Sequence, residues 1–316
     1  ETDANIEGRS GWDWLTMAMA ELAALDNVTL LPRTTAIGYY HQNFVGLCQR
    51  LTDHLADVPQ GTPRERMWKV RAAQVVLAQG AIERPLVFHG NDRPGVMLAG
   101  AARTYLNRYG VKVGQNALVV TTHDSAWLAA FDLAKAGGKV VAIVDLRPNI
   151  SSHLRAKADS LGIEVLAGWT VTGTSGRLRI KSARVRPADP TAGGARTIAC
   201  DVLMMSGGWT PSVHLFSHTK GKLNWHEEEQ AFLPGEHAEA SRTVGAGNGS
   251  FGLAKALAEG AEAGADAASD AGYNGRSAQY MVADETELTG IRVRELPTDQ
   301  NPGKAKAFVD FQNDVT

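Results

Sequence analysis

The sequence has little cysteine, little net charge and no long hydrophobic run. Its two cysteines, Cys48 and Cys200, lie far apart without a C-x-x-C spacing, which argues against a disulfide scaffold, a thiol redox centre or a cysteine zinc site. The formal net charge of −2 supplies no positive field for a nucleic acid. No apolar run reaches the roughly 18 residues of a membrane span, and the acidic start is unlike a signal peptide. We therefore expect a cytoplasmic protein with no nucleic-acid or membrane partner.

Length and composition fit a globular protein of about two domains. The 316 residues, 44% of them hydrophobic, are enough for a core in each domain. The chain opens in a polar stretch without an initiator methionine, and from Glu285 onward its pattern weakens into polar sequence with Pro297 and Pro302. We therefore expect both ends to be cut, with residues 285–316 a linker to a missing C-terminal region.

Helical and strand periodicities alternate along the chain. Residues 10–25 predict a helix that packs on a sheet, with Ser10 capping its free amides. Further helices are expected at residues 125–136, 151–160 and 253–268. Strands or β structure are expected at residues 28–31, 34–40, 44–49, 68–70, 116–120, 139–144, 163–166, 177–186 and 197–203. The segment 116–144 has the strand–helix–strand order of a βαβ crossover.

Three strand ends are followed by glycine or other small residues, within residues 75–85, 201–211 and 242–252. Turns of this kind let backbone approach a dinucleotide closely. Because they are far apart in sequence, they predict an α/β protein with two interleaved Rossmann-like, FAD/NAD(P)-binding domains. We expect a partial first domain with a β-meander at residues 1–112, a second nucleotide fold at 113–235, and a return to the first domain at 236–284.

A glycine-rich loop offers the first candidate site. Residues 247–252 read G-N-G-S-F-G, follow a strand and precede a helix, so amides at the helix start can bind phosphate oxygens. No acidic residue follows at the end of a next strand to hold a ribose, since Asp266 and Asp270 fall in or just after the helix. The alternative is that these glycines only let the helix pack tightly on a sheet.

The second nucleotide fold lacks such a loop. After Val119 and Val120 the chain reads T-T-H-D-S-A, with no glycine and with Asp124 where a pyrophosphate would lie. Side chains there block backbone approach, and the carboxylate repels phosphates. We therefore expect this fold to be degenerate, without tight dinucleotide binding, and we favour a structural role for Asp145 over a ribose contact.

Other polar residues leave alternatives open. His214 and His218 have the i, i+4 spacing of metal ligands, but no third ligand completes a zinc pattern, so solvated histidines are favoured. Arg84 could reach a phosphate or a cofactor ring, or could form a salt bridge with Glu83 or Asp92. Residues 89–96 form a polar, turn-rich crossover between the expected domains, and such crossovers line clefts where ligands bind.

Five blocks of the sequence carry a resemblance to a known family. They are residues 75–85, 91–100, 103–111, 206–211 and 304–316. With these blocks the chain resembles the alpha subunits of heterotetrameric sarcosine oxidases, and it shares parts of the pattern with subunits of proline dehydrogenase, opine oxidase and hydrogen cyanide synthase complexes. The resemblance implies domains of the pyridine nucleotide-disulfide reductase type, the first of them incomplete at its N-terminus.

The resemblance also implies an activity for the whole complex. Sarcosine would be oxidised to glycine in a beta subunit that holds FAD, and electrons would pass to FMN at the alpha–beta interface and on to oxygen, giving hydrogen peroxide. The one-carbon unit would go to tetrahydrofolate, bound in the missing C-terminal region. Beta, gamma and delta subunits would be the partners. This chain would then hold NAD, carry no catalytic residue and be inactive alone.

The candidate cofactor-binding residues lie at the strand ends and in the glycine loop. They are Ala36, Ala78, Gln79, Gly80, Arg84, Ala246, Gly247, Asn248, Gly249, Phe251 and Leu253. The resemblance places Ala36 at the adenosine half of NAD, while the N-terminal glycine fingerprint and the ribose-binding acid it implies are missing. Two other hypotheses remain: a non-catalytic assembly module with vestigial nucleotide sites, and a self-sufficient pyridine-nucleotide reductase, which the lack of a redox cysteine pair disfavours.

Overall fold

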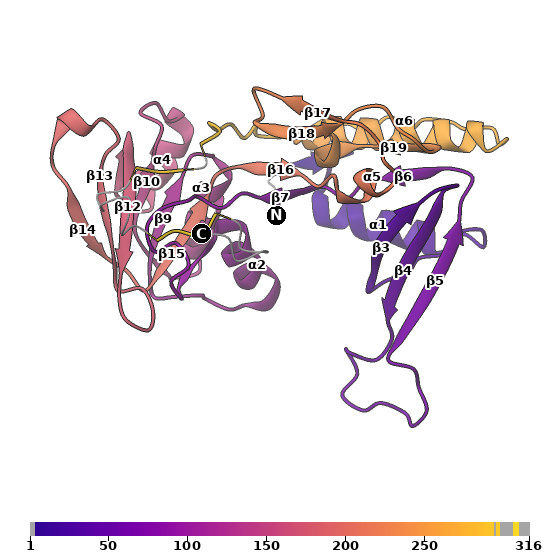
Figure 1. Cartoon of the computed structure of the whole chain (residues 1–316), viewed down its shortest axis with the longest axis horizontal. Coiled ribbons are helices and arrows are strands. Elements are labelled where there is room, and N and C mark those ends of the chain that lie inside the picture. The colour runs from indigo at the N-terminus through magenta and orange to yellow at the C-terminus, as the bar shows by residue number, and fades with distance from the viewer. Residues whose placement is uncertain (1–3, 294, 298–305, 310–316) are drawn as a thin grey trace. The chain divides into compact units, whose positions relative to one another are not determined.

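The structure, a computed structural model, describes residues 4–293, 295–297 and 306–309. The chain forms two compact units, labelled by element in Figure 1. The first unit contains the described residues up to Ile82 together with Thr210–Glu287, and the second contains Glu83–Trp209 and the described residues from Leu288 onward. Each unit is therefore built from stretches that are distant in sequence. The exact domain bounds expected from the sequence stay a prediction.

The first unit is built from small sheets and three α-helices. An antiparallel sheet joins β3 (Thr34–Tyr40), β4 (Phe44–Arg50) and β5 (Glu65–Arg71). Two parallel strands, β6 (Val75–Leu77) and β19 (Ser241–Thr243), form a second sheet. The remaining elements are β1 (Asn5–Ile6), β2 (Arg9–Ser10), α1 (Gly11–Ala23), α5 (His214–His218), β17 (Leu223–His226), β18 (Ala231–Pro234), the 3-10 turn η2 (Gly245–Asn248), α6 (Leu253–Asp270) and β20 (Val282–Ala283).

Helix α1 leaves its apolar face uncovered. Ser10 caps it as expected, since the Ser10 hydroxyl accepts a hydrogen bond from the Asp13 amide at 3.2 Å. However, α1 buries none of its residues, and the stripe of Trp12, Leu15, Met19 and Leu22 is exposed, Trp12 by 62%. The helix meets a sheet as expected, but it is only the small sheet of β2, β1 and β20. It contacts β1 and β2, which are too short to cover a helix of thirteen residues.

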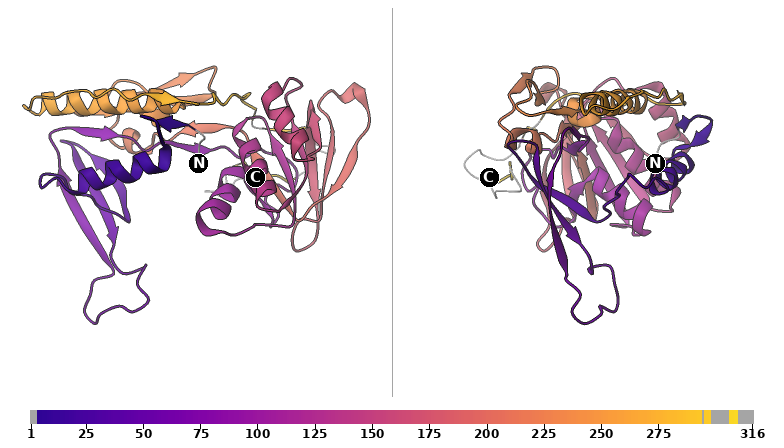
Figure 2. Two further views of the ribbon diagram at one scale, coloured as in Figure 1. Left: turned by 180° about the vertical axis from the view of Figure 1, so that it is seen from behind. Right: turned by 90° about the vertical axis from the view of Figure 1, so that its right-hand side faces the viewer.

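The second unit is a doubly covered parallel sheet. Its strand order is β11 (Val165–Ala167), β10 (Lys139–Asp145), β9 (Asn116–Thr121), β15 (Val202–Ser206) and β8 (Val96–Leu98). Helices α2 (Ala99–Tyr109), α3 (Ser125–Lys135) and α4 (Ser152–Ser160) belong to the same unit, and so does an antiparallel sheet of β12 (Trp169–Ser175), β13 (Ser182–Pro187) and β14 (Arg196–Ala199). The 3-10 turn η1 (Pro190–Ala192) lies between β13 and β14. Figure 2 shows the helices and the antiparallel sheet on opposite sides of the parallel sheet.

Both faces of this parallel sheet are buried. The helical side packs around Trp127 and Phe131 of α3, and the other side packs Leu118 and Leu203 against Val185 of the antiparallel sheet. Strands buried on both faces read as continuous apolar runs, which is why residues 116–120 and 139–144 were recognisable as strands. The predicted βαβ crossover is confirmed, because β9 and β10 pair in parallel with α3 between them.

Other expectations were wrong or incomplete. Residues 28–31 are not a strand, and the proline that follows them cannot donate to a ladder. Helix α2 and strand β12 were not expected. Short strands β7 (Ala81–Glu83) and β16 (Trp209–Pro211) occur where the chain passes from one unit to the other. In the described ranges, no helix is both long and apolar enough to cross a bilayer.

Candidate functional site

The candidate site of the first unit lies where β6 and β19 end. The two strands run in parallel, with Thr243 opposite Leu77, and the Val244 amide extends the ladder by donating to the Leu77 carbonyl at 3.0 Å. The turn at residues 78–80 and the glycine loop therefore leave the sheet at the same edge. A Cβ on Gly247 would lie 3.4 Å from the Gly80 carbonyl oxygen, so the two backbones approach closely. The structure thus brings Ala78, Gln79 and Gly80 beside Ala246 and Gly247.

Two buried polar atoms at these strand ends have no hydrogen-bond partner among the described residues. They are Oε1 of Gln79 and Oγ1 of Thr243. The other end of the Gln79 amide is fixed, because its Nε2 donates to the Ser212 carbonyl. Buried polar groups are normally satisfied, so unpaired acceptors and donors at a strand end are a feature expected of a ligand site.

The glycine loop is held by a partly buried carboxylate. Glu259 of α6 accepts hydrogen bonds from the Gly245 amide at 2.8 Å and from the Ser250 hydroxyl. Gly245 and Gly249 have φ values of +62° and +80°, a conformation that side chains disfavour. The loop is therefore fixed by glycine geometry and by its own helix. Within it, Asn248 ends η2 and Phe251 remains 41% exposed.

The first amides of α6 already have a partner. The Glu285 carboxylate accepts hydrogen bonds from the amides of Leu253 and Ala254, the second at 3.1 Å. A carboxylate at a helix N-terminus is favourable because the helix dipole is positive there. A phosphate could reach these two amides only by displacing Glu285. This role of Glu285 was not expected from the sequence, where Glu285 begins the predicted linker.

Two of the candidate residues belong to other elements than this pair of strands and their loops. Ala36 belongs to β3, where it pairs with Leu47 of β4 in the antiparallel sheet. Arg84 belongs to the second unit and is buried there. Its backbone amide donates to Gly208 at 2.8 Å and its guanidinium donates to the Trp209 carbonyl at 3.3 Å.

In the second unit, the loop that replaces a phosphate-binding turn is filled by an ionic cluster. Arg147 Nη2 lies 2.8 Å from an Asp124 oxygen and 2.7 Å from an Asp145 oxygen. Asp145 is completely buried and also accepts a hydrogen bond from Trp127 Nε1 at 2.9 Å. Desolvation lowers the pKa of Arg147, but the hydrogen bonds and charge of Asp145, with those of Asp124, outweigh it and the net pKa is raised. Arg147 therefore remains protonated.

A returning segment lies over the same loop. The Asp124 carboxylate accepts from the Thr289 amide at 2.9 Å and from its hydroxyl at 3.0 Å, and Arg147 donates to the Thr289 carbonyl at 3.1 Å. The Ile291 amide then donates to the Thr122 carbonyl. This segment lies in the stretch expected to be a linker, whose residues 298–305 and 310–316 are outside the described part of the chain.

A buried carboxylate in the second unit was not anticipated. Glu83 is 6% exposed, and its Oε2 accepts from the Gly100 amide, near the start of α2, at 2.7 Å. Burial raises the pKa of Glu83 to about 7, although hydrogen bonds from Ser206 and Gly100 oppose the rise. In the sequence, Glu83 is a single glutamate after a short apolar stretch, and this pattern does not indicate a buried carboxylate.

The two histidines at metal-ligand spacing are exposed side chains. His214 and His218 lie on the short helix α5, and His218 stacks on Tyr40 with ring centroids 6.2 Å apart. Within the described residues, no group of three His, Cys, Asp or Glu side chains could hold a metal ion. Both cysteines are free thiols, and burial raises the pKa of Cys200 to about 12.

Comparison with solved structures shows which known proteins have a similar fold. An L-proline dehydrogenase from P. horikoshii superposes with a TM-score of 0.57 at 17% identity, over 85% of this chain and 47% of the other. A thioredoxin reductase from Lactococcus lactis gives the same TM-score and identity, over 85% of both chains. These likenesses confirm an α/β fold of the FAD-dependent pyridine nucleotide-disulfide oxidoreductase type.

Sequence comparison is more specific. No family model matches the chain. The alpha subunit of the sarcosine oxidase of Corynebacterium sp. (strain P-1) is 43% identical over 98% of this chain, and that of Rhizobium meliloti is 40% identical over 99%. The A-type subunit of an opine oxidase from Rhizobium meliloti is 28% identical over 52% of it. Over nearly its whole length, this chain is homologous to the alpha subunit of sarcosine oxidase, of which it spans about a third.

Proposed function

We propose that the first unit binds NAD at the paired ends of β6 and β19, as the NAD-holding core of the alpha subunit of a sarcosine oxidase. The observation that carries the proposal is the close approach of the Gly80 turn to the Gly247 backbone. Such an approach leaves the strand ends lined by main chain rather than by side chains, and dinucleotides are bound beside backbone of this kind. The homology to sarcosine oxidase alpha subunits supports the assignment.

The residues present fit part of a dinucleotide. The unpaired oxygens of Gln79 and Thr243 can bond ribose hydroxyls or an amide, and the glycine loop is rigidly held by Glu259. The α6 amides fit a phosphate less well, since Glu285 binds them. In this proposal Gln79, Gly80, Ala246 and Gly247 contact NAD directly, while Asn248, Gly249, Phe251 and Leu253 shape the loop beside it. The proposed contacts of Ala36 and Arg84 rest on the sequence alone.

The reaction of the whole complex is part of the same proposal. The complex would oxidise sarcosine to glycine in a beta subunit containing FAD, with FMN between alpha and beta, oxygen as acceptor and tetrahydrofolate as one-carbon acceptor. Gamma and delta subunits complete it, and the complex works in the cytoplasm. The names of the relatives support an oxidoreductase subunit that functions with partners. Within such a complex this chain would bind and position NAD, and the oxidation of sarcosine would take place in the beta subunit.

A second candidate is an assembly module with vestigial nucleotide sites. The second unit favours it, because the Asp124–Arg147–Asp145 cluster and Thr289 fill the place where a pyrophosphate would bind. We propose that this second fold is degenerate. The occupation of the α6 amides by Glu285 extends the argument to the first unit.

One pair of variants separates the two candidates. We expect acid to release one NAD per chain from the purified parent protein. Gly249→Asp places a carboxylate in the glycine loop, and we expect this variant to be purified without NAD. Any side chain at Gly249 is strained by its φ of +80° and lies 3.1 Å from Leu233. Gly249→Asn is therefore the matched control, because it has the same shape, tolerates this conformation and carries no charge. If neither the parent nor Gly249→Asn retains NAD, the assembly module is the better account.

A further inference from the structure

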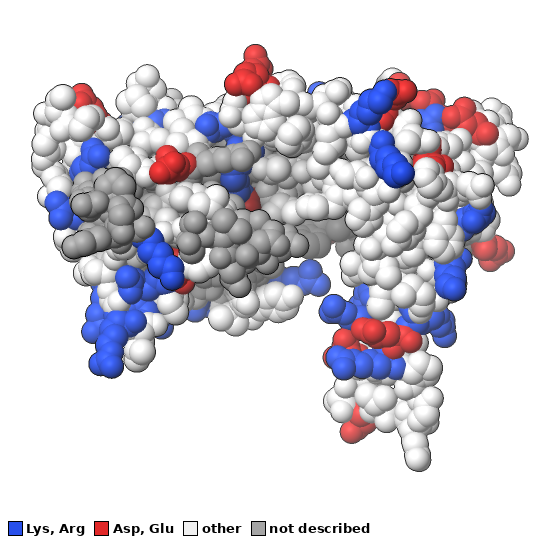
Figure 3. Space-filling view, viewed as in Figure 1, with Lys and Arg blue, Asp and Glu red and all other residues white. Residues whose placement is uncertain are grey.

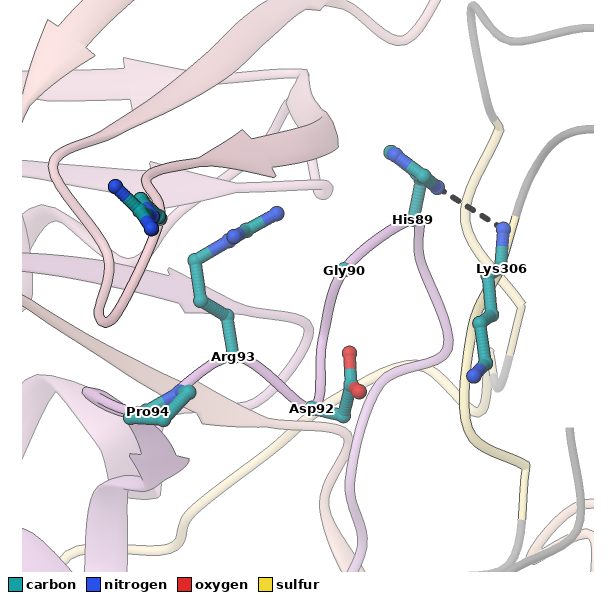
Figure 4. Close-up of a pocket in the computed structure, with 7 residues that line it drawn as sticks. His89, Gly90, Asp92, Arg93, Pro94 and Lys306 are labelled. Atoms are coloured by element: carbon teal, nitrogen blue, oxygen red, sulfur yellow. Dashed lines mark hydrogen bonds between the residues drawn. The ribbon is translucent and has the colours of Figure 1, made fainter.

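A cavity of about 350 Å³ opens in the second unit, beside the segment that leads into β8. It is lined by residues of the 89–94 crossover, by Arg177 of the β12–β13 turn and by Lys306, as Figure 4 shows. His89, Arg93, Arg177 and Lys306 can all donate hydrogen bonds, and Asp92 is the one carboxylate in the lining. Three permanent cations against one anion give the cavity a positive charge.

Arg93 is held in place beside this cavity. Its Nε donates to the Thr174 hydroxyl at 3.2 Å, and its Nη1 donates to the Gly176 carbonyl. Gly90 makes the arrangement possible, since a Cβ there would lie 2.6 Å from the Thr174 hydroxyl. Neither contact involves Nη2, so one edge of a fixed guanidinium remains to bind a ligand. An arginine ordered in advance loses less side-chain entropy when it binds an oxyanion.

The other two cations have no anionic partner among the described residues, although Lys306 Nζ lies 5.8 Å from the centre of the Phe308 ring. Arg177 and Lys306 are exposed, and no carboxylate is paired with either side chain among the described residues. Arg179 and Lys181 follow Arg177 in the same turn, and Figure 3 shows basic side chains gathered at the lower left, where this turn lies. Unpaired cations that share a cavity repel one another, and a bound anion relieves the repulsion.

His89 connects the cavity to a second one. Its Nδ1 accepts a hydrogen bond from the Lys306 amide at 3.0 Å, as the dashed line in Figure 4 marks, so the neutral ring carries its proton on Nε2 and remains a donor there. An adjoining cavity of about 210 Å³ is also lined by His89, with five hydroxyl side chains and Arg184. The five are Thr172, Thr174, Ser175, Ser182 and Thr197. Hydroxyls next to cations suit a phosphate ester of a polyhydroxylated molecule.

We propose that this cavity binds a phosphate group, with Arg93, Arg177 and Lys306 as its ligands. The site lies wholly within the second unit and is independent of NAD binding in the first. The group is either free phosphate or the phosphate of a small sugar phosphate.

Titration calorimetry on the purified chain tests the proposal, with inorganic phosphate, ribose 5-phosphate and ribose as probes. We expect at least one of the two phosphates to bind saturably and ribose not to bind. Tighter binding of ribose 5-phosphate would identify a phosphate ester as the ligand, and equal binding would identify phosphate itself. Arg177→Gln and Lys306→Gln should each raise the dissociation constant about tenfold, because each variant loses one charge-assisted hydrogen bond to the phosphate.

Lys139→Gln is the matched control, since it makes the same charge change at an exposed position at the start of β10 that does not line the cavity. It should leave the dissociation constant within twofold of the parent value. Both test residues are exposed, so the melting temperature should not change. Absence of saturable binding by either phosphate overturns the proposal, and so does unchanged affinity in both Arg177→Gln and Lys306→Gln.

Discussion

Glu83 shows how burial alone changes the chemistry of one residue. Its carboxylate is enclosed with the Gly100 amide and the Ser206 hydroxyl, and its pKa of about 7 exceeds the usual 4.5. The folded protein therefore holds this proton more tightly than the unfolded chain does. The contribution of Glu83 to stability is then greatest below about pH 4.5 and declines as the pH rises to about 7.

The corresponding prediction concerns the pH dependence of unfolding. Between pH 5 and 7.5 the free energy of unfolding should lose up to roughly 3 kcal/mol through Glu83 alone. Glu83→Gln keeps the oxygen that accepts from Gly100 and should remove this loss, as measured by urea unfolding at several pH values. Glu164→Gln is the control. Arg196 holds the pKa of Glu164 below its usual value, so this carboxyl does not titrate between pH 5 and 7.5 and its removal should leave the pH slope unchanged. An unchanged pH slope in Glu83→Gln would show that the carboxyl ionises without cost.

The cysteines differ in accessibility, which leads to a prediction about their reactivity. Cys200 is 4% exposed and its pKa is raised to about 12 by burial and by Asp201, so almost no thiolate is present at pH 8. Cys48 lies on β4 and is less buried. Ellman's reagent should therefore label one thiol per folded chain quickly and the second only after unfolding. Cys48→Ser should abolish the fast phase, and a fast phase that survives in Cys48→Ser would contradict this account.

At the scale of elements, the Asp124 carboxylate is one of several groups that hold the Thr289 segment, beside Arg147 and the Thr122 backbone. Asp124→Ala removes both hydrogen bonds to Thr289 and one of the two ion pairs of Arg147. Because Arg147 keeps Asp145, we expect a loss of about 1–3 kcal/mol in stability rather than unfolding. The segment keeps its backbone hydrogen bonds but should open more often, so trypsin should cleave after Arg292 several-fold faster. Asp189→Ala, on an exposed turn of the same unit, should leave the cleavage rate unchanged; equal rates in the parent and Asp124→Ala would mean that other contacts hold the segment.

Elements with strong local patterns could be predicted from the sequence. The apolar runs of β9 and β10, and the cap at Ser10, depend on neighbours along the chain and were recognised. Helix α2 was missed because its alanines weaken the apolar periodicity and its N-cap, Leu98, makes no side-chain hydrogen bond. The roles of Glu285 and Thr289 could not be predicted, since their partners are 31 and more residues away in sequence. The glycines after both strands were recognised, but the pairing of β6 with β19 and the nearby carboxylates were not predicted.

At the scale of the whole molecule, the two nucleotide folds differ in what fills their strand ends. In the first unit, backbone turns and two unpaired polar atoms line the edge. In the second, an ionic cluster and a returning segment occupy it. The strand ends of the first unit thus keep unpaired polar atoms, whereas those of the second are closed by its own side chains. The central claim of this account is that NAD binds in the first unit and not in the second.

Hydrogen–deuterium exchange of the NAD-free chain, measured with and without added NAD, tests that claim most directly. We predict slower exchange in residues 78–80 and 244–253 when NAD is present, and no change in residues 121–126. Slower exchange confined to residues 121–126, or no change anywhere at saturating NAD, would contradict it.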